Sequence, residues 1–130
     1  MSGLQCVVVT PEQTELDVSA QSVTVPMFDG EMGILKGHSP LVGRLGYGVL
    51  RINADGGTKN YFVEGGFVQV DNDVVSILTD KLIAMSEVTR SAADEAMQAA
   101  MEMPTDQPEV AAARERAVNR ARAMARAAGS

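Results

Sequence analysis

The chain has one histidine and one cysteine, the residue types most often used for acid–base catalysis, nucleophilic catalysis and metal binding. His38 lies in FDGEMGILKGHSPLVGRLGYG, residues 28–48, a stretch that holds six of the chain's twelve glycines. A loop that cradles a phosphate, a catalytic histidine and a docking surface would each have roughly this composition. The spacing of the residues around His38 has to separate these three possibilities.

A phosphate-binding loop does not fit the glycine spacing. Gly43, Gly46 and Gly48 reverse the G-x-G-x-x-G order, no helical pattern follows them, and no G-x-x-x-x-G-K-[ST] motif is present. A metal site is not expected either, because one histidine and one cysteine offer too few ligands and no close carboxylate pair has a suitable spacing. The sequence therefore predicts no cofactor and no bound metal.

Catalysis by His38 would need a nucleophile and an acid beside it. Ser39 follows directly in the sequence, but neighbouring side chains of an extended chain point in opposite directions. Cys6 belongs to the alternating apolar run LQCVVVT, where a small buried residue is the ordinary interpretation. We therefore expect no catalytic residues, and we interpret His38 as a surface or loop-packing histidine.

The charge is negative overall and unevenly distributed. A net charge of −6 disfavours nucleic acid as a partner, because phosphate contacts need a basic surface. Residues 1–85 carry ten acidic and five basic side chains, residues 86–108 carry five and one, and residues 109–130 carry two and five. No run approaches the ~20 consecutive apolar residues of a membrane span, so no direct membrane insertion is expected.

Up to about residue 83 the pattern predicts short strands. GVLRINADGGTKNYFVEGG indicates a hairpin that turns at Asp55-Gly56-Gly57, and FVQVDNDVVSILTD indicates a second hairpin that turns at residues 71–73. Gly65-Gly66 fits a tight connection or a bulge between neighbouring strands. Because no helical period intervenes, the predicted domain over residues 1–85 is an antiparallel β-sandwich or barrel.

From residue 86 the apolar period changes to 3.6, which predicts an antiparallel two-helix hairpin over residues 86–130. Ser86 is the expected N-cap of the first helix, residues 103–108 the connector, and Thr105 or Asp106 the N-cap of the second helix. The expected buried faces are Val88, Ala92, Ala96, Ala99 and Met103, and Val110, Ala113, Ala117, Ala121 and Met124. Because alanine buries little apolar area, we expect the hairpin to be a mobile element.

The motifs around His38 resemble those of a known family. DGEMGILKGHSPLVGRLGYGVLRI resembles the epsilon subunit of F-type ATP synthases from bacteria and chloroplasts, with its G-[IV]-L-P-G-H-[AS]-P-L motif and G-V-L-R-I strand. Lys36 stands where that family usually has proline. YFVEGGFVQVDNDVVSILTD is similar to the family's Y-x-V-x-G-G-F-x-x-[VL] stretch and its V-x-[IV]-L-x-D strand. The resemblance covers about residues 4–85, whereas the alanine-rich tail is of the same type as the family's tail but does not match it residue by residue.

The resemblance implies a non-catalytic rotor subunit of the central stalk, which couples the gamma subunit to the c-ring during proton-driven ATP synthesis. In such a subunit the following residues would lie at or near the c-ring: Glu31, Met32, Lys36 and His38, with Phe28 and Leu41 as packing support. The implied location is peripheral, on the cytoplasmic face of a bacterial plasma membrane, or on the thylakoid if the chain is chloroplast-encoded.

The resemblance also implies a regulatory role for the helical hairpin. In the family, the folded hairpin permits ATP hydrolysis, whereas the extended hairpin enters the catalytic head of alpha and beta subunits and inhibits it. The charge reversal suggests that acidic surface on the beta subunit would meet Arg114, Arg116, Arg120, Arg122 and Arg126. Some members bind ATP through an I-D-x-x-R-A motif; Thr89 and Ala92 occupy its two charged positions here, so no ATP site is expected.

A second class of function stays open on the sequence. The chain would then be a free-standing small-molecule-binding β-sandwich whose helical tail mediates oligomerisation. This alternative predicts a monodisperse protein that does not bind a gamma subunit.

Overall fold

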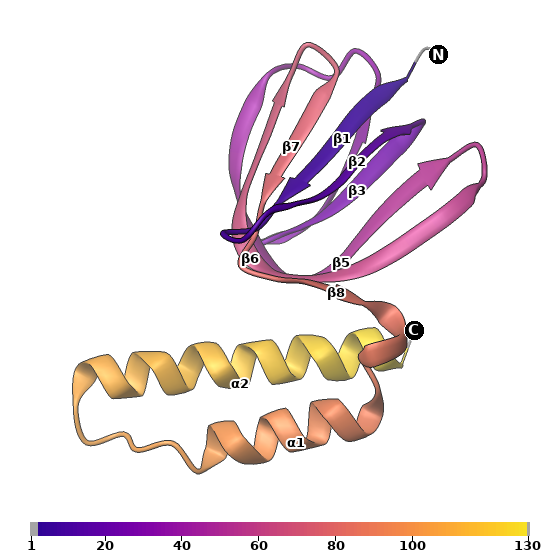
Figure 1. The fold of residues 1–130 in the computed structure, drawn as a ribbon. Helices are drawn as coiled ribbons and strands as arrows, with labels where there is room; N and C mark the ends of the chain where they lie inside the picture. The colour runs from indigo at the N-terminus through magenta and orange to yellow at the C-terminus, as the bar shows by residue number, and fades with distance from the viewer. Residues whose placement is uncertain (1–2, 130) are drawn as a thin grey trace. The chain divides into compact units, whose positions relative to one another are not determined.

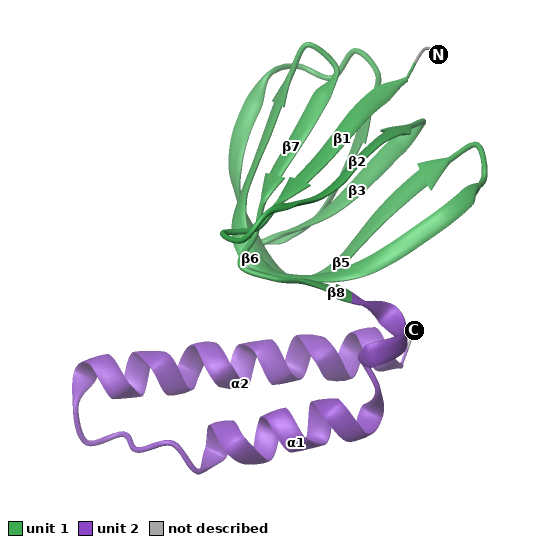
Figure 2. Ribbon diagram, viewed as in Figure 1, with its two compact units in different colours: residues 1–83 green, residues 84–130 purple. Residues whose placement is uncertain are grey.

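The computed structural model of the chain describes residues 3–129, with the strands first and the helices last (Figure 1). The strands are β1 (Leu4–Val9), β2 (Thr14–Ala20), β3 (Ser22–Met27), β4 (Gly30–Leu35), β5 (Leu41–Ala54), β6 (Gly57–Asp71), β7 (Val74–Leu78) and β8 (Leu82–Ala84). A 3-10 turn, η1 (Met85–Glu87), precedes the helices α1 (Arg90–Met101) and α2 (Pro108–Ala128). Figure 2 shows in colour two compact units, which divide between Ile83 and Ala84.

Unit 1 is built on one curved sheet. Its strands lie in the order β2-β1-β7-β6-β5-β3-β4, and β8 pairs with β6. The β1–β7 pair is parallel, and the other neighbours along this order pair antiparallel. The strands bend round to enclose a core between them (Figure 1). The predicted β-sandwich followed by a helical hairpin is confirmed.

The core of unit 1 follows from alternation along the strands. In β1, Leu4, Cys6 and Val8 are buried, whereas the residues between them are partly exposed. Successive side chains of a strand point to opposite faces, so every second apolar residue reaches the interior. The same core receives Val23, Val25, Ile34, Leu50, Val68 and Ile77 from the other strands. An apolar residue out of phase with this pattern therefore lies on the outer face.

Both predicted hairpins are present. β5 and β6 pair up to Ala54 and Gly57, so Asp55-Gly56 forms the tip. β6 and β7 are joined through Asn72 and Asp73, whose φ angles are 52° and 64°. Asparagine and aspartate tolerate this left-handed region better than other non-glycine residues, which explains their place in a two-residue hairpin turn.

Gly65-Gly66 has a different role from the predicted connection or bulge. Both glycines lie inside β6, with φ angles of +70° and +112°. The pairs Leu45–Gly66 and Tyr47–Glu64 keep one register across the site, so the strand bends without inserting a residue. A Cβ atom on Gly66 would lie 1.8 Å from the carbonyl oxygen of Leu78. Glycine is required because the backbone of a neighbouring segment passes this close.

The helix ends differ from the predicted ones. Thr89, rather than Ser86, is the N-cap of α1, and its side-chain oxygen accepts a 3.0 Å hydrogen bond from the Ala92 N–H. Neither Thr105 nor Asp106 caps α2; Gln107 takes that position without a side-chain hydrogen bond, and Pro108 is the first helical residue. Proline fits there because its missing N–H would have no partner in the first turn. The connector is therefore residues 102–107.

Within unit 2, α1 and α2 lie side by side and run in opposite directions (Figure 1). On α1, Ala93 and Ala100 are buried, whereas Ala99, which we expected to be buried, is exposed. On α2, Ala121 and Met124 are buried as predicted, together with Val118, Ala123 and Ala127. Val88 is buried as predicted and Ala92 and Ala96 are half-buried, so the predicted face of α1 was wrong only at Ala99. Alanines lie on several sides of each helix, so their period fits more than one buried face.

Candidate functional site

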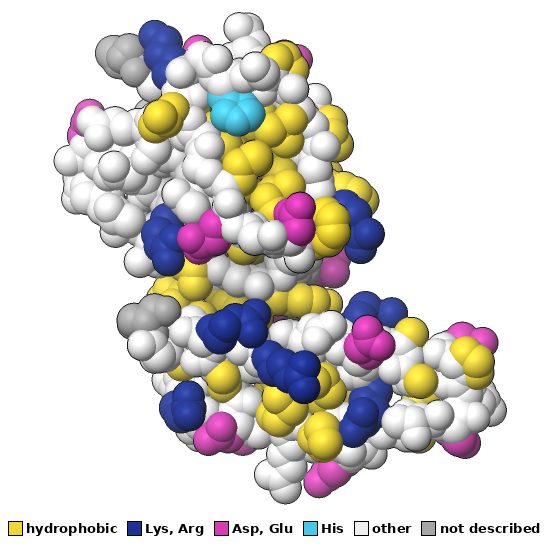
Figure 3. All heavy atoms as spheres, turned by 180° about the vertical axis from the view of Figure 1, so that it is seen from behind, with side chains coloured by type: hydrophobic (Ala, Val, Ile, Leu, Met, Phe, Trp, Pro, Cys, Tyr) yellow, Lys and Arg dark blue, Asp and Glu magenta, His cyan; other side chains and the backbone are white. Residues whose placement is uncertain are grey.

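The predicted docking stretch forms two strands and two turns rather than one glycine-rich loop. Residues 30–35 are β4, which pairs with β3 in a tight hairpin, and residues 36–40 form the turn that leads into β5. Glu31 and Met32 therefore lie in a strand, whereas Lys36 and His38 lie in the turn. Figure 3 shows one face of unit 1 on which hydrophobic side chains gather beside the histidine, with charged side chains at their border.

The two strand residues differ in what they present. Glu31 is exposed and forms a 3.0 Å ion pair with Nη1 of Arg51 on β5. Met32 is half-buried and packs against the core of unit 1, as does Leu41 at the start of β5. Met32 and Leu41 therefore support the hairpin from inside, and Glu31 presents a charge whose position is fixed by Arg51.

The turn at residues 36–40 holds its histidine through local contacts. The His38 N–H donates to the Leu35 carbonyl oxygen over 3.1 Å, and Nδ1 of the ring lies 2.7 Å from the Ser39 carbonyl oxygen, to which it donates. Lys36 is exposed and His38 is half-buried. One hydrogen bond joins the turn to a segment that is distant in the sequence, the β6–β7 hairpin. There Oδ1 of Asp73 accepts a 2.7 Å hydrogen bond from the Gly37 N–H.

Cys6 is a core residue. Its side chain has no exposed surface, and burial, together with the negative charge of Asp17, raises its pKa to about 12. At neutral pH the thiol therefore stays protonated and out of contact with solvent, unlike the thiolates that act as nucleophiles.

An exposed apolar surface that sequence reasoning missed crosses three neighbouring strands. Arg44 on β5 pairs with Phe67 on β6, and Phe67 pairs with Leu78 on β7, so the three side chains stand in a row on the outer face. The ring of Phe28 continues this row, with its centroid 5.6 Å from the guanidinium carbon of Arg44. Val42 lies on the same face of β5, two residues before Arg44.

We call Phe28, Val42, Phe67 and Leu78, with Arg44 among them, the apolar stripe. The exposed fractions of the four apolar residues are 66%, 73%, 54% and 50%, which is unusual for side chains of this size. For Phe67 and Leu78 the signal in the sequence was their phase, since each lies next to a buried residue of its strand, Val68 and Ile77 respectively. Val42 alternates with the exposed Arg44 along β5, and Phe28 lies in the turn after β3. That signal becomes a surface only once the register of the three strands is known.

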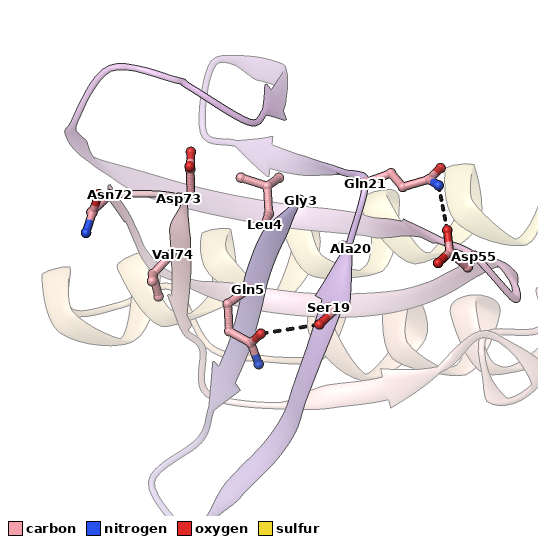
Figure 4. A pocket seen from close by; sticks show the side chains of 10 residues that line it. All are labelled: Gly3, Leu4, Gln5, Ser19, Ala20, Gln21, Asp55, Asn72, Asp73 and Val74. Atoms are coloured by element: carbon pink, nitrogen blue, oxygen red, sulfur yellow. Dashed lines mark hydrogen bonds between the residues drawn. The ribbon is translucent and has the colours of Figure 1, made fainter. Parts of the chain in front are cut away.

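A polar pocket of about 370 Å³ lies at the end of unit 1 where several turns meet (Figure 4). Its wall includes a Gln21 Nε2 to Asp55 Oδ1 hydrogen bond of 2.6 Å and a Ser19 Oγ to Gln5 Oε1 hydrogen bond of 3.5 Å. These polar groups are thus satisfied by one another. Over residues 3–129 there is no group of three histidine, cysteine or acidic side chains arranged to hold a metal ion.

The arginines of α2 are not equivalent. Arg114 is half-buried, and its Nη2 donates to the Met101 sulfur over 3.3 Å. Arg116, Arg122 and Arg126 are exposed, and Arg120 is half-buried. Three of the five arginines of α2 are therefore exposed on its surface. At the predicted degenerate nucleotide motif, the Thr89 hydroxyl is engaged by the Ala92 N–H.

The comparisons with known proteins agree with this fold. Residues 3–85 match the family described as the ATP synthase delta/epsilon chain, beta-sandwich domain. An ATP synthase epsilon chain from Rhodopirellula baltica is 48% identical over 125 residues, which are 96% of this chain and 98% of the relative. One from Synechococcus sp. strain WH7803 is 42% identical over 93 residues, covering 72% and 68% of the two chains. The chain belongs to the ATP synthase epsilon chain family.

Two solved structures share the fold at lower identity. A chain of the mitochondrial ATP synthase of Euglena gracilis, solved as OSCP/F1/c-ring, superposes with a TM-score of 0.84 at 24% identity, covering 98% of this chain and 82% of that one. A chain of the Tetrahymena thermophila central stalk/c-ring gives 0.77 at 17% identity, covering 96% of both. Among residues 3–129, no helix combines the length and the apolar character that crossing a membrane requires.

Proposed function

We propose that this chain is a non-catalytic rotor subunit of an ATP synthase, which joins the gamma subunit to the c-ring and restrains ATP hydrolysis through its helices. The observation that carries the proposal is the 48% identity to an epsilon chain over nearly the full length of both chains. We further propose a peripheral position on the cytoplasmic side of a bacterial plasma membrane, in line with the bacterial relatives.

The apolar stripe is the surface that we assign to gamma. The stripe holds four large apolar side chains that are at least half exposed to water. A partner that covers them removes this apolar surface from water, which stabilises the complex. Arg44 lies among them, and an arginine surrounded by aromatic and aliphatic side chains is a typical centre of a protein interface. A surface of this kind suits a lasting contact, as a rotor stalk requires.

The turn at residues 36–40 and the β3–β4 hairpin are the surfaces that we assign to the c-ring. They present Lys36, His38 and the Glu31–Arg51 ion pair, so they are polar and carry both signs of charge. Charges at the rim of an interface fix its orientation more than they add affinity. A contact of this kind suits the transmission of torque between two parts that must keep one relative orientation.

The test of the gamma surface compares exposed apolar positions inside and outside the stripe. Phe67→Asp or Leu78→Asp places a charge in the stripe, and we expect the affinity for the gamma subunit of the same organism to fall at least about tenfold. Leu35→Asp is the matched control, because Leu35 is 63% exposed but lies on β4, outside the stripe. Isothermal titration calorimetry measures the affinities. Equal loss for all three variants, or no loss for any, would contradict the assignment.

The helical hairpin is the part to which we assign control of hydrolysis. The side chains buried on α1 are alanines, each of which contributes about one methyl group, or roughly 0.8 kcal/mol, to the packing. High helix propensity keeps both helices folded when they separate. Val118 and Met124 of α2 are buried as well, but α1 adds little to the packing, so the hairpin can open. Exposed arginines of α2 can then meet acidic side chains on the catalytic beta subunit.

Latency of ATP hydrolysis tests this assignment in the assembled complex. The double variant Arg116→Ala/Arg122→Ala removes two exposed positive charges, and we expect it to raise the hydrolysis rate by a fewfold at low salt. Arg90→Ala, which removes an exposed arginine from the first residue of α1, is the control and should leave the rate unchanged. Unchanged latency in the double variant would count against the arginines as inhibitory contacts.

A further inference from the structure

The turn at residues 36–40 is fixed by a residue far away in the sequence. Gly37 donates its N–H to Oδ1 of Asp73 over 2.7 Å, and 36 positions separate the two residues. The backbone oxygen of Asp73 also accepts a 2.9 Å hydrogen bond from the Gln5 N–H. Asp73 therefore ties three segments together at one end of unit 1: the turn, the β6–β7 hairpin and the start of β1.

No other hydrogen bond within residues 3–129 joins this turn to a distant segment. The contacts of His38, to the Leu35 and Ser39 carbonyl oxygens, are local to the turn. The strands on either side are held by their ladders, as in the Leu35–Ser22 and Leu41–Val70 pairs. Between these two anchors the orientation of the turn depends on the Asp73 carboxylate.

The backbone conformation of the β6–β7 turn does not by itself require an aspartate at position 73. Asp73 has a φ angle of +64°, a region that glycine occupies without strain. Gly37 also lies in this region, with φ of +85°, and its N–H points at the carboxylate. A glycine at position 73 would serve the hairpin equally well, so what the aspartate adds is its acceptor for the Gly37 N–H.

We propose that Asp73 is the positioning residue of the docking turn, holding Lys36 and His38 in the orientation in which they meet the c-ring. The proposal rests on the assignment of this turn to the c-ring made above. It predicts that the carboxylate acts before docking, by ordering the turn in the free subunit, so that less conformational entropy is lost when the ring binds.

Two substitutions at the same position separate the carboxylate from the backbone conformation. Asp73→Gly keeps the left-handed turn but removes the acceptor, and Asp73→Asn keeps both the turn and a carbonyl oxygen at the acceptor position. In the full-length chain we expect the Gly37 amide hydrogen to exchange roughly three- to tenfold faster in Asp73→Gly, and close to the wild-type rate in Asp73→Asn. The melting temperatures should stay similar.

Docking is measured with the chain bound to gamma and titrated with detergent-solubilised c-ring. We expect a severalfold loss of affinity for Asp73→Gly and little loss for Asp73→Asn. Unchanged Gly37 exchange in Asp73→Gly would overturn the positioning role directly. Faster exchange with unchanged docking would overturn it as well, provided that Lys36→Glu weakens docking. If neither Asp73→Gly nor Lys36→Glu alters docking, the assignment of the turn to the c-ring fails and the proposal fails with it.

Discussion

Cys6 and Gly66 illustrate how strand geometry decides the properties of single residues. Cys6 occupies an inward position of β1 and is packed among core side chains, so its thiol behaves as a small apolar group. Gly66 occupies the bend of β6, where the Leu78 carbonyl oxygen leaves no room for a Cβ atom. The sequence predicted the burial of Cys6 because alternation is a local signal. The need for glycine at position 66 was not predictable, since the carbonyl oxygen that excludes a side chain there belongs to Leu78 in another strand.

The thiol of Cys6 predicts a loss of stability at alkaline pH. Because burial, and then Asp17, raise its pKa from 9.0 to about 12, the folded chain holds this proton more tightly than the unfolded chain does. Its contribution to stability is complete below pH 9 and is lost as the pH rises toward 12. Urea unfolding at several pH values should show a steeper decline for the native chain than for Cys6→Ala. Parallel declines would show that the thiol does not titrate in this way.

Glycine substitutions on β6 predict a graded loss of stability. Gly66→Ala combines a left-handed φ with a backbone clash and should lower the free energy of unfolding by about 3 kcal/mol or more. Gly65→Ala has the left-handed φ but open space, so the cost should be about 1 kcal/mol. Gly56→Ala, with open space and no left-handed φ, is the control and should be nearly neutral. Chemical denaturation measures all three, and equal values for Gly66→Ala and Gly56→Ala would contradict the structure.

The elements themselves were largely predictable, because their signals are local. Turn residues such as Asp55-Gly56 and Asn72-Asp73 stand between alternating runs, and they mark both hairpins. The helix ends were less well predicted, since Ser86 and Thr89 are both capping residue types and lie three positions apart. The choice between them depends on the 3-10 turn at Met85–Glu87, which delays the start of α1.

Thr89 predicts a specific effect on helix stability. Thr89→Ala removes the acceptor of the Ala92 N–H and should destabilise α1 by about 1 kcal/mol. Ser86→Ala alters a hydroxyl in the preceding turn and should have little effect. Urea unfolding followed by ellipticity at 222 nm, where helices dominate the signal, compares the two. A larger effect for Ser86→Ala than for Thr89→Ala would contradict the structure and indicate Ser86 as the N-cap.

At the scale of the whole molecule, the surfaces to which we assign a function are assembled by long-range strand pairing. The apolar stripe combines residues 28, 42, 44, 67 and 78, and it exists only because β5, β6 and β7 pair in one register. The link between Asp73 and Gly37 also depends on segments far apart in the sequence. The motifs around His38 predicted one docking segment, but composition and periodicity could not show which side chains of different strands face outward together.

A stalk subunit must bind gamma. Co-expression with the gamma subunit of the same organism, followed by purification through a tag on gamma and native mass spectrometry, measures this binding. We predict a stable one-to-one complex that survives gel filtration. A chain that elutes alone, monodisperse and free of gamma, would contradict the stalk assignment and favour a free-standing β-sandwich.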